Sequence, residues 1–239
     1  MLFVFVDESG DSKFKDYLGI CVVTINYTKY AKVKSEFQDI LRNSNWDESI
    51  EFKGSCLFSA SSGDRAVPID ERIDIAEKVV ELTNSKANAR INFHYLRTEA
   101  APEDHSKEYL RLLPVLLDKA IPKAPKGAGK NIATIHLDQR DDQDIVELRE
   151  QVVPVFQEKN YVMFEEPQMH VSNFNTVGIL YADIIGYLAA RIDTIANDAE
   201  LFEQIPPEEW ENNGKIKKLQ SSVGLVSKVK NLQEYEVKL

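Results

Sequence analysis

The sequence predicts an α/β domain with a mixed central sheet flanked by helices. Short runs rich in β-branched residues alternate with longer segments whose apolar residues recur at helical spacing. The chain opens on two such runs, Leu2–Asp7 and Tyr17–Ile25, with turn residues between them. We therefore expect an opening hairpin followed by alternating strands and helices, which is the pattern of an α/β fold.

Length and composition agree with one domain. The chain has 239 residues, of which 43% are hydrophobic and 28% charged, enough for a sizeable core. No apolar run approaches the roughly 18 residues of a membrane span, and the apolar start reaches Asp7 too soon for a signal peptide. We expect a cytoplasmic protein with no membrane partner, in which Cys21 and Cys56 are reduced thiols.

The later elements follow from periodicity and from cap and breaker residues. Thr28 is the expected N-cap of the first helix, and Pro114 is expected to kink the third. A short helix is expected after Pro206, and insertions at 59–64 and 100–130. Helices are predicted at 28–42, 68–82, 106–121, 143–156 and 176–195, and further strands at 89–96, 131–138 and 161–164.

The charge is acidic overall but unevenly distributed. A net charge of −10 argues against a generally basic nucleic-acid binder. Residues 214–239 nevertheless hold six lysines and two glutamates, and four more lysines lie between 119 and 130. We expect 214–239 to be a basic extension of a domain that spans 1–213. Its lysines either face solvent or contact phosphate, in which case removing the extension should weaken substrate binding and its salt dependence.

Three aspartates stand in apolar surroundings. Strand-like runs end at Asp7 and at Asp138, and Asp183 lies inside the apolar segment 178–188. A buried carboxylate is costly unless it is paired or binds a metal. Parallel neighbours would bring the first two to one edge of the sheet. With Glu51 as a fourth acid, the set suits the oxygen-seeking ions Mg²⁺ and Mn²⁺ and two-metal phosphoryl chemistry.

Each acid also has a plain structural interpretation. Asp7 could begin a turn, Asp138 could simply end a strand, and Asp183 could pair with Arg191. His136, two residues before Asp138, is expected on the same face of the strand, either packed or near the acids.

Four pieces of the chain carry a resemblance to a known family. Phe5–Asp11, Glu51–Gly54, Ile135–Asp138 and Tyr181–Tyr187 resemble, in order, motifs of the bacterial family called domain of unknown function 3800, a member of the ribonuclease-H-like superfamily. The resemblance spans about residues 1–191. It departs at Leu180, where the family often carries a glutamine.

The resemblance implies a ribonuclease-H-like fold and a Mg²⁺- or Mn²⁺-dependent nuclease acting on DNA or RNA. On that basis Asp7 would bridge two metals, Asp138 and Asp183 would each complete one, and Glu51 would bind a metal or position water. The residues expected to support the site or contact phosphate are Glu8, Ser9, Lys53 and His136, with Glu8 on the opposite strand face.

Two alternatives stay open. The pair Glu51-x-Lys53, with Asp7 as the earlier acid, also fits a restriction-type nuclease, although that leaves Asp138 and Asp183 without a role. The other alternative is a non-catalytic binding or regulatory module on the same fold, which the acidic net charge and Leu180 favour.

Overall fold

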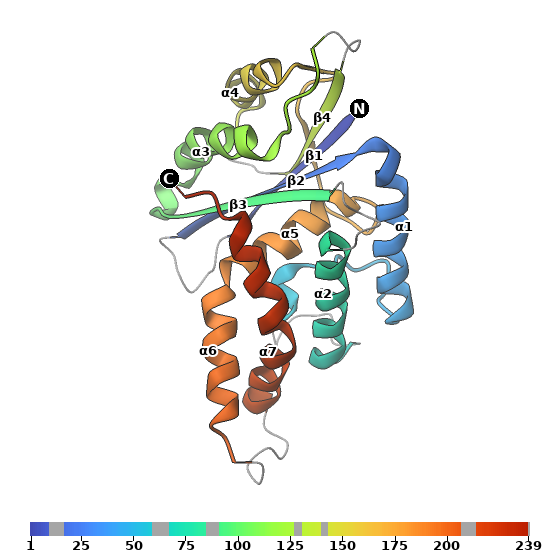
Figure 1. Cartoon of the computed structure of the whole chain (residues 1–239), viewed down its shortest axis with the longest axis vertical. Coiled ribbons are helices and arrows are strands. Elements are labelled where there is room, and N and C mark those ends of the chain that lie inside the picture. The colour runs from blue at the N-terminus through green and yellow to red at the C-terminus, as the bar shows by residue number, and fades with distance from the viewer. Residues whose placement is uncertain are drawn as a thin grey trace.

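The computed structural model describes residues 1–9, 17–58, 67–84, 91–126, 131–139, 143–206 and 214–238. Its centre is a six-stranded sheet in which five strands follow the order β3-β2-β1-β4-β5, and β6 pairs with the C-terminal part of β4. Figure 1 labels the four strands β1 to β4. The strands are β1 (Leu2–Ser9), β2 (Tyr17–Asn26), β3 (Ile91–Glu99), β4 (Asn131–Asp138), β5 (Tyr161–Met163) and β6 (Gln168–His170).

The sheet is mixed. β1 pairs with β2 and β2 with β3 in antiparallel fashion, whereas β4 runs parallel to β1 and to both β5 and β6. Helices cover both faces (Figure 1). These pairings confirm the predicted α/β fold with a mixed sheet and an opening hairpin. The strand β6 was not predicted, because three residues carry too little pattern to detect.

One face of the sheet is covered by α3 (His105–Ala120) and α4 (Ile145–Glu158), whose leucines and valines pack against the even-numbered residues of β1. The other face holds α1 (Tyr27–Asn43), α2 (Ile69–Asn84) and α5 (Val177–Ala190), with Phe5 of β1 in the core between them. Alternation along β1 thus sends Val4 and Val6 to one layer and Phe5 and Asp7 to the other.

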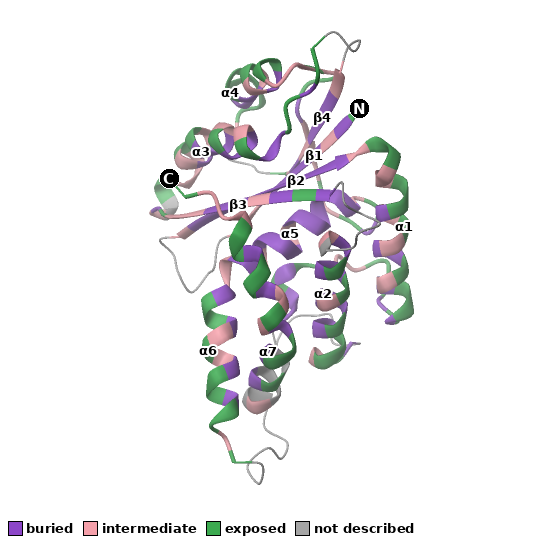
Figure 2. Ribbon diagram, in the orientation of Figure 1, coloured by how far each residue is buried: buried purple, intermediate pink, exposed green. Residues whose placement is uncertain are grey.

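Helix α5 is the most deeply buried helix described. Apart from Asp183, Tyr187 and Ala190, all its residues are buried, and it lies between the sheet and the outer helices (Figure 2). It ends at Ala190, and a second helix, α6 (Ile192–Glu203), follows Arg191. The prediction of one helix over 176–195 was wrong because the apolar spacing continues across this break through Ile192 and Ile195.

The C-terminal segment forms a helix, α7 (Gly214–Lys230), followed by the short 3-10 helix η5 (Asn231–Tyr235). Helices α6 and α7 lie side by side, and α7 also contacts α2 (Figure 1). Leu225 and Val229 of α7 and Leu232 of η5 belong to the main core. Beyond them, Val237 N donates a hydrogen bond to Tyr95 O on β3.

The first helix is capped by a different residue than the sequence predicts. Asn26, not Thr28, caps α1, because the Asn26 side chain accepts from the Thr28 backbone N–H at 3.1 Å. The predicted insertion at 59–64 and the segment between Pro206 and Gly214, where a short helix is expected, lie outside the described residues. The other short helices are η1 (Gly54–Cys56) and η3 (Pro102–Asp104). In the part of the chain that the structure describes, no helix is both long and apolar enough to cross a membrane.

Candidate carboxylate site

The parallel pairing of β1 and β4 brings two aspartates to the same edge of the sheet. The last paired residues are Val6 and Leu137, so Asp7 and Asp138 come next on neighbouring strands. Both follow the strand alternation that places Phe5 and His136 on the α5 side of the sheet. Two carboxylates from distant parts of the chain therefore share one sheet edge.

Asp7 is the most buried acid described, with 6% of its surface exposed. Burial raises its pKa well above the ordinary value, and the charges of Asp183, Glu8 and Asp138 raise it further. The backbone N–H of Glu8 donates to Asp7 Oδ1 at 2.8 Å, which acts in the opposite direction. The Asp7 carboxylate thus sits in an environment with an excess of negative charge.

Asp183 completes the group from α5. Burial raises the pKa of Asp183 to about 6, and the charges of Glu51 and Asp138 act in the same direction. A hydrogen bond from Gly54 N at 2.8 Å and the charge of Lys53 lower the pKa and only partly offset this. Arg191, the alternative partner, lies over the Tyr187 ring at 4.6 Å. Leu180, the residue at which the resemblance departs, is fully buried in the core.

Glu51 and Lys53 approach from the segment before η1. Lys53 Nζ lies 3.1 Å from Glu51 Oε2, and half of the Lys53 side chain is exposed. Partial burial lowers the pKa of Lys53, but the ion pair with Glu51 and the charges of Asp138 and Asp183 outweigh it, so the pKa is raised overall. The half-exposed Lys53 therefore lies near the acids and could meet a phosphate.

The remaining predicted residues lie around this group. Glu8 precedes Ser9 on β1, on the strand face opposite Asp7, and its charge still raises the pKa of Asp7. The Ser9 hydroxyl lies near Gly19 of β2, where a Cβ atom would come within 2.6 Å of it. The structure therefore puts Ser9 against its hairpin partner.

Two residues near Asp138 were not singled out as site residues. Ser172 Oγ donates to Asp138 Oδ1 at 2.6 Å and so fixes the orientation of that carboxylate. His170 of β6 lies 2.9 Å (Nε2) from His136 Nδ1, and Thr134 Oγ1 lies 3.0 Å from His136 Nε2. Burial, then the charge of His170, lowers the pKa of His136 to about 4. The role of Ser172 could not be predicted, because a single serine in a loop carries no sequence signal for orienting a carboxylate.

The donor set suits a divalent cation. Four carboxylates from three strand or loop segments and one helix influence one another electrostatically, and burial raises the pKa of two of them. A bound cation would reverse that penalty. Among the described residues, however, no three His, Cys, Asp or Glu side chains are close enough to form a ready-made metal site. The carboxylates converge on one region without being preassembled as a chelate.

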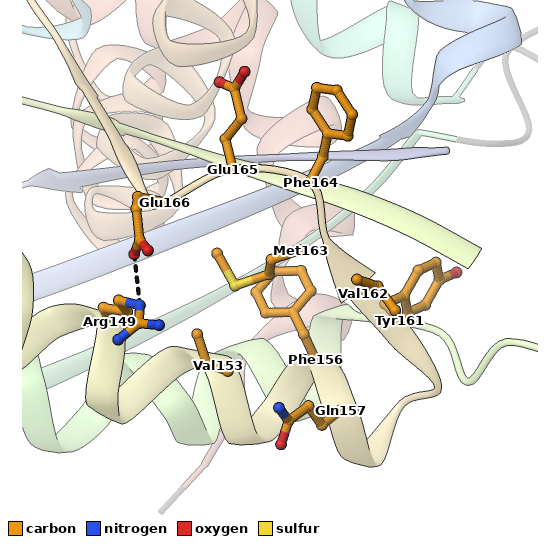
Figure 3. Close-up of a pocket in the computed structure, with 10 residues that line it drawn as sticks. All are labelled: Arg149, Val153, Phe156, Gln157, Tyr161, Val162, Met163, Phe164, Glu165 and Glu166. Carbon is orange, nitrogen blue, oxygen red and sulfur yellow. Dashed lines mark ion pairs between the residues drawn. The ribbon is translucent and has the colours of Figure 1, made fainter. Parts of the chain in front are cut away.

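Two hollows among the described residues lie away from the carboxylate site. One of about 290 Å³ lies between α4 and β5 and is lined by Phe156, Met163 and Phe164 among others (Figure 3). Across it, Arg149 Nε and Glu166 Oε2 form an ion pair of 2.6 Å. This hollow shares no residue with the carboxylate site, and its exposed ion pair carries little energy.

Comparison with known proteins gives structural likenesses only. No protein-family model and no curated protein sequence matches the chain. Ribonuclease HII from Archaeoglobus fulgidus, solved with PCNA, is 12% identical with a TM-score of 0.42, over 94% of this chain and 89% of that one. Ribonuclease H2 from Pyrococcus horikoshii OT3 is 12% identical with a TM-score of 0.40, over 93% and 99%. Bst-RNase HIII, solved with Mn²⁺, is 12% identical with a TM-score of 0.33, over 95% and 70%.

Proposed function

We propose that this chain is a divalent-metal-dependent nuclease that hydrolyses phosphodiester bonds of DNA or RNA. Asp7, Glu51, Asp138 and Asp183 would hold Mg²⁺ or Mn²⁺. The four motifs in order support membership of the bacterial family called domain of unknown function 3800 and, with it, a cytoplasmic enzyme. The proposal depends on one observation above all: Asp7 and Asp138 share one sheet edge, Asp183 of α5 interacts with both, and burial and mutual repulsion raise the pKa of Asp7 and of Asp183.

In this proposal the residues of the site have different roles. Asp7 lies within β1, two residues before its end, Asp138 is the last residue of β4, and the Asp183 carboxylate accepts a hydrogen bond from Gly54 N. Ser172 orients Asp138. Lys53, half exposed beside Glu51, offers a positive charge to the phosphate of an incoming strand. When bound, divalent ions orient a water molecule and stabilise the leaving oxygen.

A cleavage assay tests the proposal. End-labelled single- and double-stranded DNA, RNA and a DNA–RNA hybrid are incubated with the chain in EDTA, Mg²⁺ or Mn²⁺. We expect cleavage only with metal and a loss of about 100-fold or more in Asp7→Asn. Asp39→Asn, an exposed aspartate of α1, is the matched control and should cleave normally. Equal cleavage by Asp7→Asn and the unchanged protein would reject the assignment.

A second candidate is a non-catalytic binding module. The absence of a ready-made three-ligand group among the described residues favours it. Thermal unfolding separates the two candidates, because a ligand that binds the folded state raises the melting temperature. The nuclease proposal expects millimolar Mn²⁺ to raise the melting temperature of the unchanged protein but not that of Asp7→Asn. If Mn²⁺ does not change the melting temperature and no substrate is cleaved, the result supports the binding module.

A further inference from the structure

A small pocket lies beside the carboxylate site. It has a volume of about 160 Å³ and is formed by β1, β4, β6, α1, the loop before α5 and the first turn of α5. Much of its lining is aromatic or imidazole, and the residues that matter here are Phe3, Phe5, Tyr30, His136, His170 and Asn175. At this size it accommodates a single heterocycle rather than a drug-sized ligand.

The rings of the pocket are arranged as a stacking surface. The Phe5 ring is roughly parallel to those of Tyr30 and His136, with centroids 5.3 and 5.2 Å away. Phe3 lies 4.9 Å from Tyr30 and 6.0 Å from His136. Phe3, Tyr30 and His136 are only partly buried, so their rings reach the pocket surface. Partly exposed aromatic rings of this kind can stack on any of the nucleobases, because every base has a flat π-face.

The same pocket carries polar groups at fixed positions. His136 is held between Thr134 Oγ1 at 3.0 Å and His170 Nε2 at 2.9 Å, which sets the orientation of its ring. Asn175 stands exposed at the rim. A nucleobase, with an apolar face and hydrogen-bonding edges, matches this combination.

The residues that line the pocket are near neighbours of the acids on the same strands. His136 lies two residues before Asp138 on the same face of β4, and His170 pairs with Asp138 across the β4–β6 ladder. On β1, Phe5 lies two residues before Asp7, again on the same face. A nucleotide whose phosphate reached the carboxylates would therefore carry its base toward these rings.

We propose that this pocket binds one unpaired nucleobase of the nucleotide next to the phosphate held at the carboxylate site. The position of that nucleotide rests on the proposed function, whereas the binding of a base by the pocket does not. The proposal implies a substrate with at least one unstacked base, as in a single strand, a loop or a frayed end.

Base binding is tested by NMR in EDTA, so that no catalysis is involved. The chain has only four histidines, whose ring protons give four resolvable sets of signals. Adenosine or uridine at millimolar concentration should shift the signals of His136 and His170, which line the pocket. Ribose is the matched ligand control and should shift neither. His94 and His105 serve as internal references.

Variants locate the effect. Tyr30→Leu removes a ring of the pocket and should weaken the nucleoside affinity roughly 5- to 150-fold, the range of a lost base–aromatic stack. Tyr27→Leu, an exposed tyrosine one turn earlier on α1, should leave the affinity unchanged. If Tyr30→Leu does not fold, Asn175→Trp, at an exposed rim position, fills the pocket and should abolish the shifts.

The outcomes separate this inference from the proposed function. The base-binding proposal is wrong if neither nucleoside shifts the His136 and His170 signals, or if ribose shifts them equally. This holds even if the protein cleaves nucleic acid. Nucleoside-specific shifts that Tyr30→Leu or Asn175→Trp weakens support it even if no cleavage is found.

Discussion

At the residue scale, the ionised carboxylate of Asp183 works against folding. Burial raises its pKa from 3.8 to about 6, so the folded protein takes up this proton before the unfolded chain does. The ionised form is therefore penalised above about pH 6, and the penalty disappears as the pH falls toward 4. A displacement of this size corresponds to roughly 2–3 kcal/mol. The buried negative charge of the site therefore lowers the stability of the metal-free protein at neutral pH.

We therefore predict that Asp183→Asn stabilises the metal-free protein at pH 7.5 by on the order of 2 kcal/mol. The amide oxygen can still accept from Gly54 N, so the local structure is retained. The gain should shrink as the pH falls from about 6 to 4, because wild-type Asp183 then becomes neutral. Chemical unfolding in EDTA at several pH values measures it. A gain that is constant with pH would contradict the assigned pKa.

Ser172 acts through another residue, since its hydroxyl donates to Asp138 at 2.6 Å. Ser172→Ala should lower metal-dependent cleavage about 10- to 100-fold, the usual effect of losing a hydrogen bond that orients a ligand. Ser172→Thr, which keeps the hydroxyl, should restore much of the rate. Ser35→Ala, an exposed serine of α1, is the control. Raising the Mn²⁺ concentration should partly rescue Ser172→Ala but not Asp138→Asn, which separates positioning from direct ligation.

At the element scale, the site depends on how closely η1 approaches α5. A Cβ atom on Gly54 would lie 2.8 Å from Tyr187 Cγ and 3.3 Å from Asp183 O, so only glycine fits without movement. That approach lets Gly54 N reach the Asp183 carboxylate. The glycine thus couples the packing of two elements to the position of one acid.

Gly54→Ala should therefore destabilise the protein by about 1–3 kcal/mol, the usual cost of overpacking, and should weaken metal-dependent cleavage. Gly224→Ala is a matched control, because there the new methyl group meets only the flexible end of Glu77 at 2.5 Å. Thermal unfolding compares the two variants. An equal loss in both would show that the η1–α5 contact is not special.

Some elements of the fold could be predicted from the pattern of apolar residues, and others could not. Asp7 and Asp138 could be placed at one sheet edge from the apolar runs that precede them. The predicted strand end at Asp7 was wrong, since β1 continues to Ser9, whereas β4 does end at Asp138. The break at Arg191 could not be predicted, since no glycine or proline accompanies it. Helix α7 was expected only as a basic extension, because its many lysines and serines obscure a short apolar stripe. Contacts such as Ser172 with Asp138 arise only once the chain is folded.

At the scale of the whole molecule, the C-terminal segment is part of the core rather than an appendage. Leu219 and Leu225 of α7 are buried, and Lys228 Nζ pairs with Glu77 at 2.8 Å and with Glu81 at 2.9 Å on α2. At least this lysine is therefore engaged within the protein. Deleting 214–239 would expose core side chains worth about 1.5–3 kcal/mol each, a large share of the stability of a typical domain.

We predict that the deletion abolishes cooperative unfolding, so point variants must replace it in any test of phosphate contacts. Leu225→Ala should cost about 2–5 kcal/mol, because it leaves a cavity in the core. Lys228→Ala should cost at most about 1 kcal/mol, since its ion pairs are partly exposed. Urea unfolding measures both, with Lys230→Ala at an exposed position as control. A deleted chain that still unfolds cooperatively would show that 1–213 folds alone, and its binding to nucleic acid at low and high salt would then report directly on the C-terminal lysines.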